Sequence, residues 1–260
     1  PFYVQLEYEY RYGALILDGA SPTLRDMRFE DINTTSVLAA NLAQPNFIGG
    51  EYVAGNDEES GVTGQAVQIY GGGTPISPMI FKDATFQSTN KGCGNRDGGR
   101  SAIWASQTFI RVETSDFAGG DFGISIRNSA GKVTNSTISV TCNGIDVNSL
   151  KAIGNTEYDV EIADNVITTT QRTPITAYSG ADVRIHNNQL AGADQGSGIA
   201  VYSSKAEIHN NDIGPIGGWN GLWLLGSFDV RAENNTISDT AREPILAGEY
   251  GTQAPSPTPA

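Results

Sequence analysis

Short runs in which apolar and polar residues alternate recur along this chain at nearly regular intervals. The clearest pair occupies residues 185–190 and 208–213, which read IHNNQL and IHNNDI and lie 23 residues apart. Each copy joins an alternating run to two polar residues and a further aliphatic residue. A unit of this length cannot bury its own apolar face, so it has to stack on copies of itself. The alternation is typical of β-strands, and we therefore expect a solenoid of short strands.

The same phrase can be followed along most of the chain. It consists of an apolar residue, a bend residue two positions later and an apolar residue three positions after the bend, and it occurs nine times. The bend residues are Asp26, Gly49, Asp83, Thr114, Asn135, Asp164, Asn187, Asn210 and Asn234. Asn, Asp and Gly tolerate a left-handed backbone or hydrogen-bond their own main chain in tight turns. We therefore expect a column of bends, in which stacked Asn side chains can form a hydrogen-bonded ladder.

A second alternating pattern, four residues long, accompanies these phrases. The stretches occupy residues 15–18, 37–40, 67–70, 103–106, 124–127, 145–148, 175–178, 199–202, 222–225 and 245–248. Their first and third positions are almost always aliphatic, so we expect these to face the core. Examples are Leu15, Ile69, Ile126, Val147 and Val201. The second and fourth positions are expected to face outward, onto a groove.

These repeats together resemble the right-handed parallel β-helix of the pectate-lyase-like group, which includes the NosD and carbohydrate-binding and sugar-hydrolase types. The resemblance implies an all-β, single-stranded right-handed parallel β-helix (solenoid) of about nine to ten rungs. Each rung would contain three short strands and one bend of the Asn-rich column. The resemblance covers about residues 13–250. Because many chemistries and purely structural proteins share this scaffold, the resemblance predicts the fold rather than the activity.

The two ends of the sequence differ from the repeat. Residues 1–12 alternate and are rich in Tyr, and we interpret them as an N-terminal cap or a partial rung that covers the open end. Residues 251–260 are Pro-rich and are expected to form an extended C-terminal spacer. Such a spacer is compatible with self-association or with an anchor beyond it.

Charge and cysteine content limit the classes of partner and compartment. The formal net charge is −13, which disfavours nucleic acid as a partner because phosphate binding requires clustered Lys and Arg. No run is apolar and long enough for membrane insertion. Cys93 and Cys142 lie in loops two rungs apart, about 10 Å by stacking alone. We predict that the Gly-rich loop of Cys93 closes this gap to form a disulfide, in an extracellular or cell-surface protein, with two free thiols as the alternative.

Metal ligation is not expected. The triplet at residues 57–59, Asp-Glu-Glu, could offer oxygen ligands to Ca²⁺, but it lacks the spaced ligands of a calcium loop. His186 and His209 occupy the same position in consecutive rungs. A histidine pair without a third ligand is more typical of a solvent-facing ladder than of a metal site. We therefore predict no cofactor.

Candidate functional side chains gather at the outward positions of the middle stretches. The ligand-binding candidates are Tyr70, Trp104, Arg127, Asn148, Tyr178, Tyr202 and Trp223. Aromatic rings with polar tips, mixed with Arg and Asn, suit sugar rings, which have apolar faces and hydroxyl edges. The catalytic candidates are Asp146, Arg127 and Asp121. Glycoside hydrolysis requires two carboxylates, and only Asp146 lies centrally, so Asp121 would have to approach it.

Three functional hypotheses follow from these patterns. The first is a glycan-binding module, the second a structural protein of a surface layer or adhesive assembly, and the third a polysaccharide lyase or glycoside hydrolase acting on an acidic polysaccharide. The motifs of polygalacturonases, alginate epimerases and pectate lyases are missing. Whether the protein is an enzyme stays open, and a single central carboxylate favours binding or a structural role.

Overall fold

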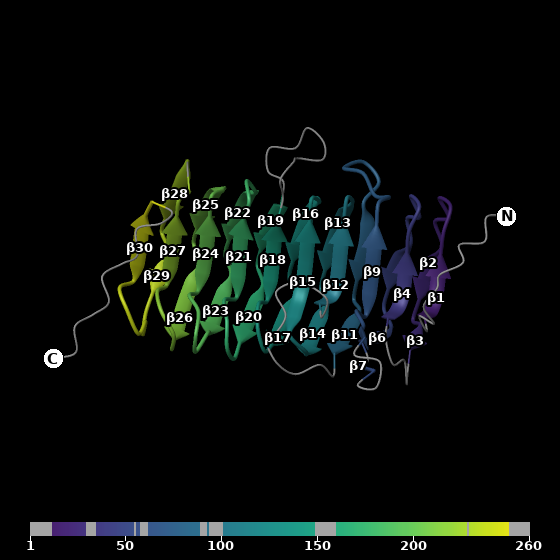
Figure 1. Ribbon diagram of the computed structural model, residues 1–260, viewed down its shortest axis with the longest axis horizontal. Coiled ribbons are helices and arrows are strands. Elements are labelled where there is room, and N and C mark those ends of the chain that lie inside the picture. The colour runs from purple at the N-terminus through teal and green to yellow at the C-terminus, as the bar shows by residue number, and fades with distance from the viewer. Residues whose placement is uncertain are drawn as a thin grey trace.

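Three parallel sheets wrap around one core in a computed structural model, which describes residues 12–29, 35–54, 56–57, 62–88, 93, 101–148, 160–227 and 229–249. Strands from the three sheets follow one another along the chain, so each set of three makes one rung (Figure 1). The rungs stack in sequence order from the N-terminal to the C-terminal end of the solenoid. β7 (Asn56–Asp57) and β8 (Val62–Thr63) form a separate antiparallel pair.

Among the described residues, sheet A has ten strands, and these overlap the ten stretches of four alternating residues found in the sequence. They are β1 (Tyr12–Ile16), β4 (Thr35–Ala39), β9 (Val67–Tyr70), β12 (Ser101–Ser106), β15 (Phe122–Arg127), β18 (Ile145–Asn148), β21 (Ile175–Tyr178), β24 (Ile199–Tyr202), β27 (Leu222–Leu225) and β30 (Ile245–Gly248). The predicted parallel β-helix of nine to ten rungs with three strands per rung is confirmed.

Sheets B and C have nine strands each in the part of the chain that the structure describes. Sheet B contains β2 (Thr23–Arg25), β5 (Asn46–Ile48), β10 (Met79–Lys82), β13 (Phe109–Glu113), β16 (Ala130–Thr134), β19 (Val160–Ala163), β22 (Asp182–His186), β25 (Lys205–His209) and β28 (Val230–Glu233). Sheet C contains β3 (Arg28–Phe29), β6 (Glu51–Ala54), β11 (Thr85–Ser88), β14 (Asp116–Gly119), β17 (Thr137–Val140), β20 (Val166–Thr169), β23 (Gln189–Gly192), β26 (Asp212–Ile216) and β29 (Thr236–Ile237). The expected cap before Tyr12 and the spacer of residues 251–260 lie outside the described residues.

The core consists of the inward positions of all three sheets. Ile69, Ile126, Val147 and Val201 are completely buried, as predicted. In the first rung the pairing differs by one residue from the register predicted from the sequence, because Ala14 pairs with Val37, Leu15 with Leu38 and Ile16 with Ala39. Three aliphatic residues in succession leave no alternation from which the register of the first rung could be determined.

One core column of sheet C changes composition along the solenoid. In the first rungs it is a stack of aromatic rings, with centroids 5.5 Å apart for Phe29 and Tyr52, 5.3 Å for Tyr52 and Phe86, and 4.9 Å for Phe86 and Phe117. The same position in the following rungs is aliphatic, occupied by Ile138, Ile167, Leu190 and Ile213. In-register stacking thus places like residues against like.

The predicted bend column is confirmed at all nine positions. Every bend residue has a positive φ, between 44° and 65°. This is the left-handed conformation that Asn, Asp and Gly adopt at the least cost. The bend separates sheet B from sheet C in each rung, because the bend residue follows a strand of sheet B and precedes one of sheet C.

The buried asparagine ladder is formed by a different column from the one predicted. In four consecutive rungs the residue after the bend is an Asn that points inward, and Asn165, Asn188, Asn211 and Asn235 hydrogen-bond in series, with Nδ2–Oδ1 distances of 3.0, 2.9 and 2.9 Å. Each Oδ1 of the last three also accepts the backbone N–H of the asparagine one rung before it. The bend residues of these four rungs are exposed, although Asn187 still donates to Asp164 at 3.1 Å.

The last described rung leaves core positions in contact with solvent. Ile245 of β30 pairs with Leu222 of β27, which is 1 % exposed, yet Ile245 itself is 52 % exposed. Ile237 of β29 continues the sheet C column beyond the fully buried Ile213 and is only partly buried.

Asn188→Ala should lower the free energy of unfolding by about 1–3 kcal/mol, because it leaves buried partners of the ladder on both sides unsatisfied. Asn187→Gly, at the neighbouring exposed bend with φ 56°, is the matched control and should change stability little. Urea unfolding followed by circular dichroism measures both. Equal stability of the two variants would show that the ladder contributes nothing.

Candidate functional site

The outward side chains of sheet A form two columns that cross the middle of the solenoid. In-register pairing places Arg127, Asn148, Tyr178 and Tyr202 in one column, on four consecutive strands from β15 to β24. Asp146 belongs to the adjacent column, between Ser125 and Thr176. Since neighbouring strands lie about 4.8 Å apart, side chains distant in sequence meet here.

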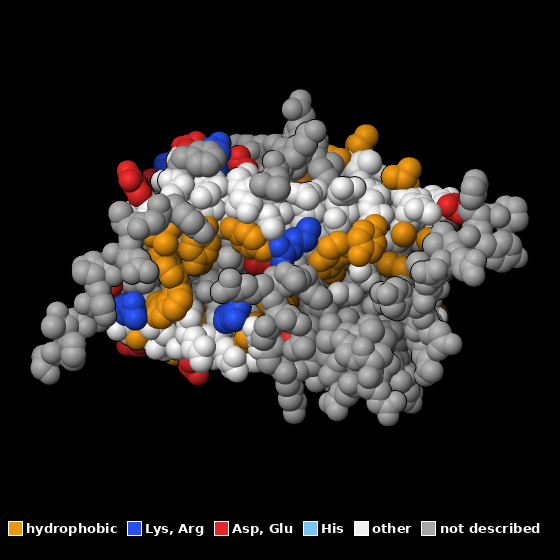
Figure 2. Space-filling model, in the orientation of Figure 1, with side chains coloured by type: hydrophobic (Ala, Val, Ile, Leu, Met, Phe, Trp, Pro, Cys, Tyr) orange, Lys and Arg blue, Asp and Glu red, His pale blue; other side chains and the backbone are white. Residues whose placement is uncertain are grey.

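A cleft of about 550 Å³ lies over this part of sheet A. It is lined by Phe122, Arg127, Asn143, Asp146, Arg172, Tyr178, Ser179, Tyr202 and Ser203. On this face, basic side chains lie between two groups of hydrophobic side chains (Figure 2). The cleft is therefore polar and partly cationic at its centre.

Arg127, Asp146 and Tyr178 form a closed hydrogen-bonded triangle. Arg127 Nη2 lies 2.8 Å from Asp146 Oδ2, Tyr178 donates its hydroxyl to the same oxygen at 3.0 Å, and Arg127 Nη1 donates to the hydroxyl of Tyr178. Arg127 Nε also donates to Ser125 Oγ at 3.0 Å. Three strands thus hold one guanidinium in a defined orientation.

Asp146 is almost inaccessible, with 5 % of its side chain exposed. Burial raises the pKa of its carboxyl group above the usual value, and the Arg127 charge and hydrogen bonds from Tyr178 and Asn143 act in the opposite direction. Asn143 Nδ2 reaches the second carboxylate oxygen at 3.3 Å. Both oxygens of Asp146 therefore already accept hydrogen bonds within the protein.

Tyr178 remains a neutral phenol well into the alkaline range. Burial, followed by the negative charge of Asp146, raises its pKa far above the usual value. Its ring also lies beside the Arg127 guanidinium, whose Cζ is 5.4 Å from the ring centroid.

Pairs of aromatic rings lie on either side of this centre along sheet A. Tyr70 and Trp104, on β9 and β12, have centroids 4.7 Å apart. On the other side, Tyr202 and Trp223 have centroids 5.6 Å apart, and Trp219 lies 4.5 Å from Trp223 in an edge-on arrangement. Tyr70 is 43 % exposed, so this flank is open to a ligand.

The structure brings together most of the predicted site. Arg127, Asp146, Tyr178 and Tyr202 line the cleft. The other candidates, Tyr70, Trp104, Asn148 and Trp223, lie on the same sheet without lining the cleft. Trp104 and Trp223 are half-buried, so their ring faces are only partly available.

Asp121 does not join this group. It is completely buried at the corner before β15 and does not line the cleft, so the structure does not pair it with Asp146 on the cleft surface. Asp121 and Asp146 lie in neighbouring rungs, which is why the sequence suggested that they meet. The side chain of Asp121 is buried at the corner and therefore does not face the groove.

Four cleft residues lie in corners and were missed from the sequence. Asn143 and Arg172 precede strands of sheet A, whereas Ser179 and Ser203 follow strands β21 and β24 and have positive φ. The signal that would have found these residues is a hydrogen-bonding residue at the same corner in consecutive rungs, as with the two serines.

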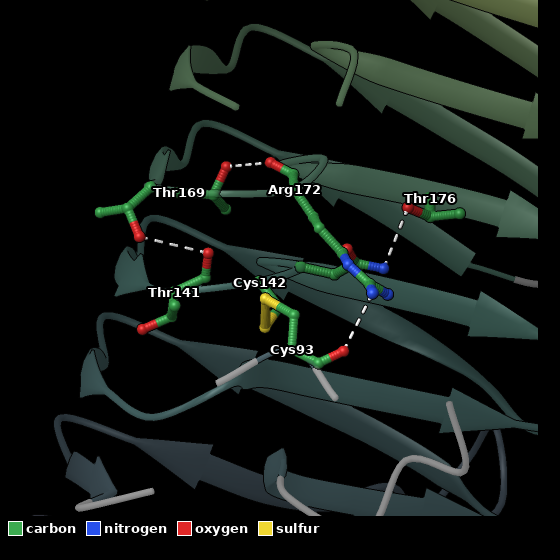
Figure 3. The surroundings of a disulfide bond; sticks show 8 residues. Cys93, Thr141, Cys142, Thr169, Arg172 and Thr176 are labelled. Atoms are coloured by element: carbon green, nitrogen blue, oxygen red, sulfur yellow. Dashed lines mark hydrogen bonds between the residues drawn. A yellow bond between two sulfur atoms is a disulfide. The ribbon is translucent and has the colours of Figure 1, made fainter. Parts of the chain in front are cut away.

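The predicted disulfide between Cys93 and Cys142 is confirmed, with a Cα–Cα distance of 5.6 Å (Figure 3). Cys142 is completely buried at the corner after β17. Cys93 follows β11 along the chain, and β11 lies two rungs before β17 in sheet C.

The two histidines stack on sheet B, away from the cleft. The rings of His186 and His209 are 4.9 Å apart and nearly parallel, and His186 Nε2 lies 3.2 Å from Glu161 Oε1. Burial, followed by the charge of His186, lowers the pKa of His209. Within the described ranges, no three His, Cys, Asp or Glu residues are grouped to hold a metal ion. Glu58 and Glu59 of the acidic triplet lie outside those ranges.

The stacked parallel sheets and the polar cleft on one of them define a parallel β-helix protein with an elongated surface site. A family model described as "Right handed beta helix region" matches residues 8–213 and 153–253, and the chain belongs to this family. The predicted right-handed class is therefore confirmed. The part of the chain that the structure describes contains no helix able to cross a membrane.

A tailspike is similar to this protein in fold. The crystal structure of the Dettilon tailspike protein aligns with a TM-score of 0.63 and 17 % identity, covering 86 % of this chain and 45 % of the tailspike chain. At this identity the likeness concerns the fold alone, and the protein spans less than half of the tailspike's length. No curated protein matches the sequence.

Arg127→Met should destabilise the protein by about 3 kcal/mol near neutral pH, because it leaves the buried carboxylate of Asp146 without its cation. The pKa of Asp146 is already raised by burial and would rise further. A carboxyl whose folded-state pKa is raised costs stability as pH rises above its unfolded value of about 3.9. The loss should therefore shrink below about pH 4.

Urea unfolding at several pH values measures this effect. The double variant Arg127→Met with Asp146→Asn removes both charges and is the control, which should recover most of the stability near neutral pH. A destabilisation that is the same at acidic and neutral pH would instead indicate lost packing of the Arg127 side chain.

Proposed function

We propose that this protein is a glycan-binding module whose ligand lies along sheet A, across the cleft. The observation that carries this proposal is the placement of aromatic pairs on both sides of a hydrogen-bonding centre on one sheet. From Tyr70 on β9 to Tyr202 on β24 there are five rung steps, which span roughly 24 Å at 4.8 Å per strand. An extended chain of several sugar rings fits such a surface.

The aromatic flanks and the centre have complementary roles. Exposed ring faces contact the apolar faces of sugar rings, and the hydroxyl and guanidinium groups hydrogen-bond to their edges. Arg127 has five N–H groups, of which three are used by Ser125, Tyr178 and Asp146. The other two have no hydrogen-bond partner among the described residues and are free to donate to sugar oxygens.

The carboxylates support binding rather than turnover. Asp146 is the one acidic side chain among the described residues that line the cleft, and both of its oxygens accept hydrogen bonds from the protein. Glycoside hydrolysis generally requires two carboxylates that flank the scissile bond. In the proposed role, Asp146 orients Arg127 and Tyr178.

The same proposal places the protein outside the cell or on its surface. A disulfide forms and persists in an oxidising compartment, which supports this location. A structural or adhesive assembly remains compatible with glycan binding, with the Pro-rich residues 251–260 as the predicted spacer. In this proposal ring contact supplies affinity, and the central hydrogen bonds supply orientation.

A glycan array that contains neutral and acidic polysaccharides tests the proposal. The parent protein should bind a subset, and Tyr202→Ala should weaken that binding about tenfold, as expected for loss of one stacking ring worth roughly 1.4 kcal/mol. Arg111→Ala is the control, because Arg111 is exposed on sheet B. Absence of binding to any glycan, or an unchanged affinity of Tyr202→Ala, would count against the proposal.

Product analysis on the bound polysaccharides separates binding from catalysis. We expect no shortened products after prolonged incubation. Cleavage that disappears in Asp146→Asn would replace the binding proposal with a lyase or hydrolase function, with Asp146 as its acid or base.

A further inference from the structure

A second arginine reaches the cleft from outside the Arg127 triangle. Arg172 lies on the corner between β20 and β21, lines the cleft, and donates from Nη2 to the backbone carbonyl of Cys93 at 2.9 Å. In Figure 3 its side chain extends from its own corner toward Cys93, beside the disulfide. The contact joins residues that are 79 positions apart in sequence.

The backbone of Arg172 is held by the corners stacked on either side. Gln171 donates its N–H to the carbonyl of Thr141 at 2.8 Å, and Gln195 donates to the carbonyl of Gln171 at 2.7 Å. Thr169 donates its hydroxyl to the carbonyl of Arg172 itself. The guanidinium therefore extends from a backbone with little freedom to move.

The disulfide holds the partner of Arg172 in place. The carbonyl that accepts the hydrogen bond from Arg172 Nη2 belongs to Cys93, and Cys93 forms the disulfide with the completely buried Cys142. Cys142 in turn donates its N–H to the carbonyl of Asp121 at 2.7 Å. The covalent bond thus positions a neutral acceptor that orients Arg172 over the cleft.

The charge of Arg172 is not balanced within the cleft. Arg127 forms an ion pair with Asp146, whereas Arg172 contacts a neutral carbonyl and has no carboxylate partner in the described part of the chain. Two guanidinium groups against one carboxylate leave the lining with an excess of one positive charge. The net charge of the protein is −13, so most of its surface repels an anionic ligand group. The excess positive charge in the cleft attracts such a group.

We propose that Arg172 is a specificity-determining residue that binds the carboxylate or sulfate group of an anionic sugar, and that the Cys93–Cys142 disulfide is required to position it. This inference rests on the proposed glycan-binding function. The planar guanidinium, with one N–H used by Cys93, retains donors for a bidentate contact with such a group. The disulfide then affects ligand choice as well as stability.

Two probes test the anion site separately from the glycan-binding function. The first is free glucuronate, titrated while the side-chain Nε–Hε resonance of Arg172 is followed by NMR. The resonance should shift toward a saturating value as glucuronate is added, and it should not shift when glucose is added instead. Absence of a shift overturns the proposed anion site whatever the glycan array shows.

The second probe is the same array of carboxylated, sulfated and neutral glycans with the Arg172→Gln variant. Binding to the anionic glycans should weaken about tenfold or more, as expected for loss of one charge-assisted pair, while neutral glycans bind as before. Arg111→Gln, on sheet B, is the matched control. Equal losses for anionic and neutral glycans, or no loss, would overturn the role of Arg172 and leave the general glycan-binding proposal standing.

The role of the disulfide is tested on the parent protein after reduction and blocking of the thiols. Circular dichroism establishes that the β-structure persists at the temperature of the assay. The reduced protein should lose binding to the same anionic glycans as the Arg172→Gln variant. Reduction of the Arg172→Gln variant should cause no further loss of binding. Unchanged selectivity after reduction would show that Cys93 does not position Arg172.

Discussion

Parallel pairing in register, repeated at one strand spacing, is the constraint on which this structure depends. It places each residue directly beside its counterpart in the next rung, so every position becomes a column along the solenoid. A column is stable when its members stack or bond with themselves. The aromatic stack from Phe29 to Phe117 and the asparagine ladder from Asn165 to Asn235 satisfy this condition by ring contact and by amide hydrogen bonds.

The same constraint explains which parts of the fold could be predicted. Periodic aliphatic positions and the left-handed bends depend on local chemistry, so the ten strands of sheet A and all nine bends were recognisable in the sequence. The ladder was assigned to the wrong asparagine because two adjacent polar residues occur in several rungs. Only the direction of the side chain, inward for Asn188 and outward for Asn187, distinguishes them.

The candidate site was predictable where it lies on strands and not where it lies on corners. Arg127, Asp146 and Tyr178 meet because their strands are stacked, and rung counting was sufficient to group them. The position of Arg172 depends on a disulfide between two rungs and on a hydrogen bond to a backbone carbonyl. Alternation carries no information on either. Asp121 shows the converse, since nearness by rung number does not ensure exposure on the groove.

The exposed final rung has a consequence for how the solenoid opens. Each rung is stabilised mainly by its neighbours, and the rung of β30 has a described neighbour on one side only, with Ile245 half exposed. Local opening should therefore be easier in this rung than in the buried rungs beside it, so its amide hydrogens should exchange faster. The disulfide fastens the rungs of β11 and β17 together, and the cleft lies close to this fastened region. The binding surface thus belongs to a part of the solenoid that should open less readily than the rung of β30.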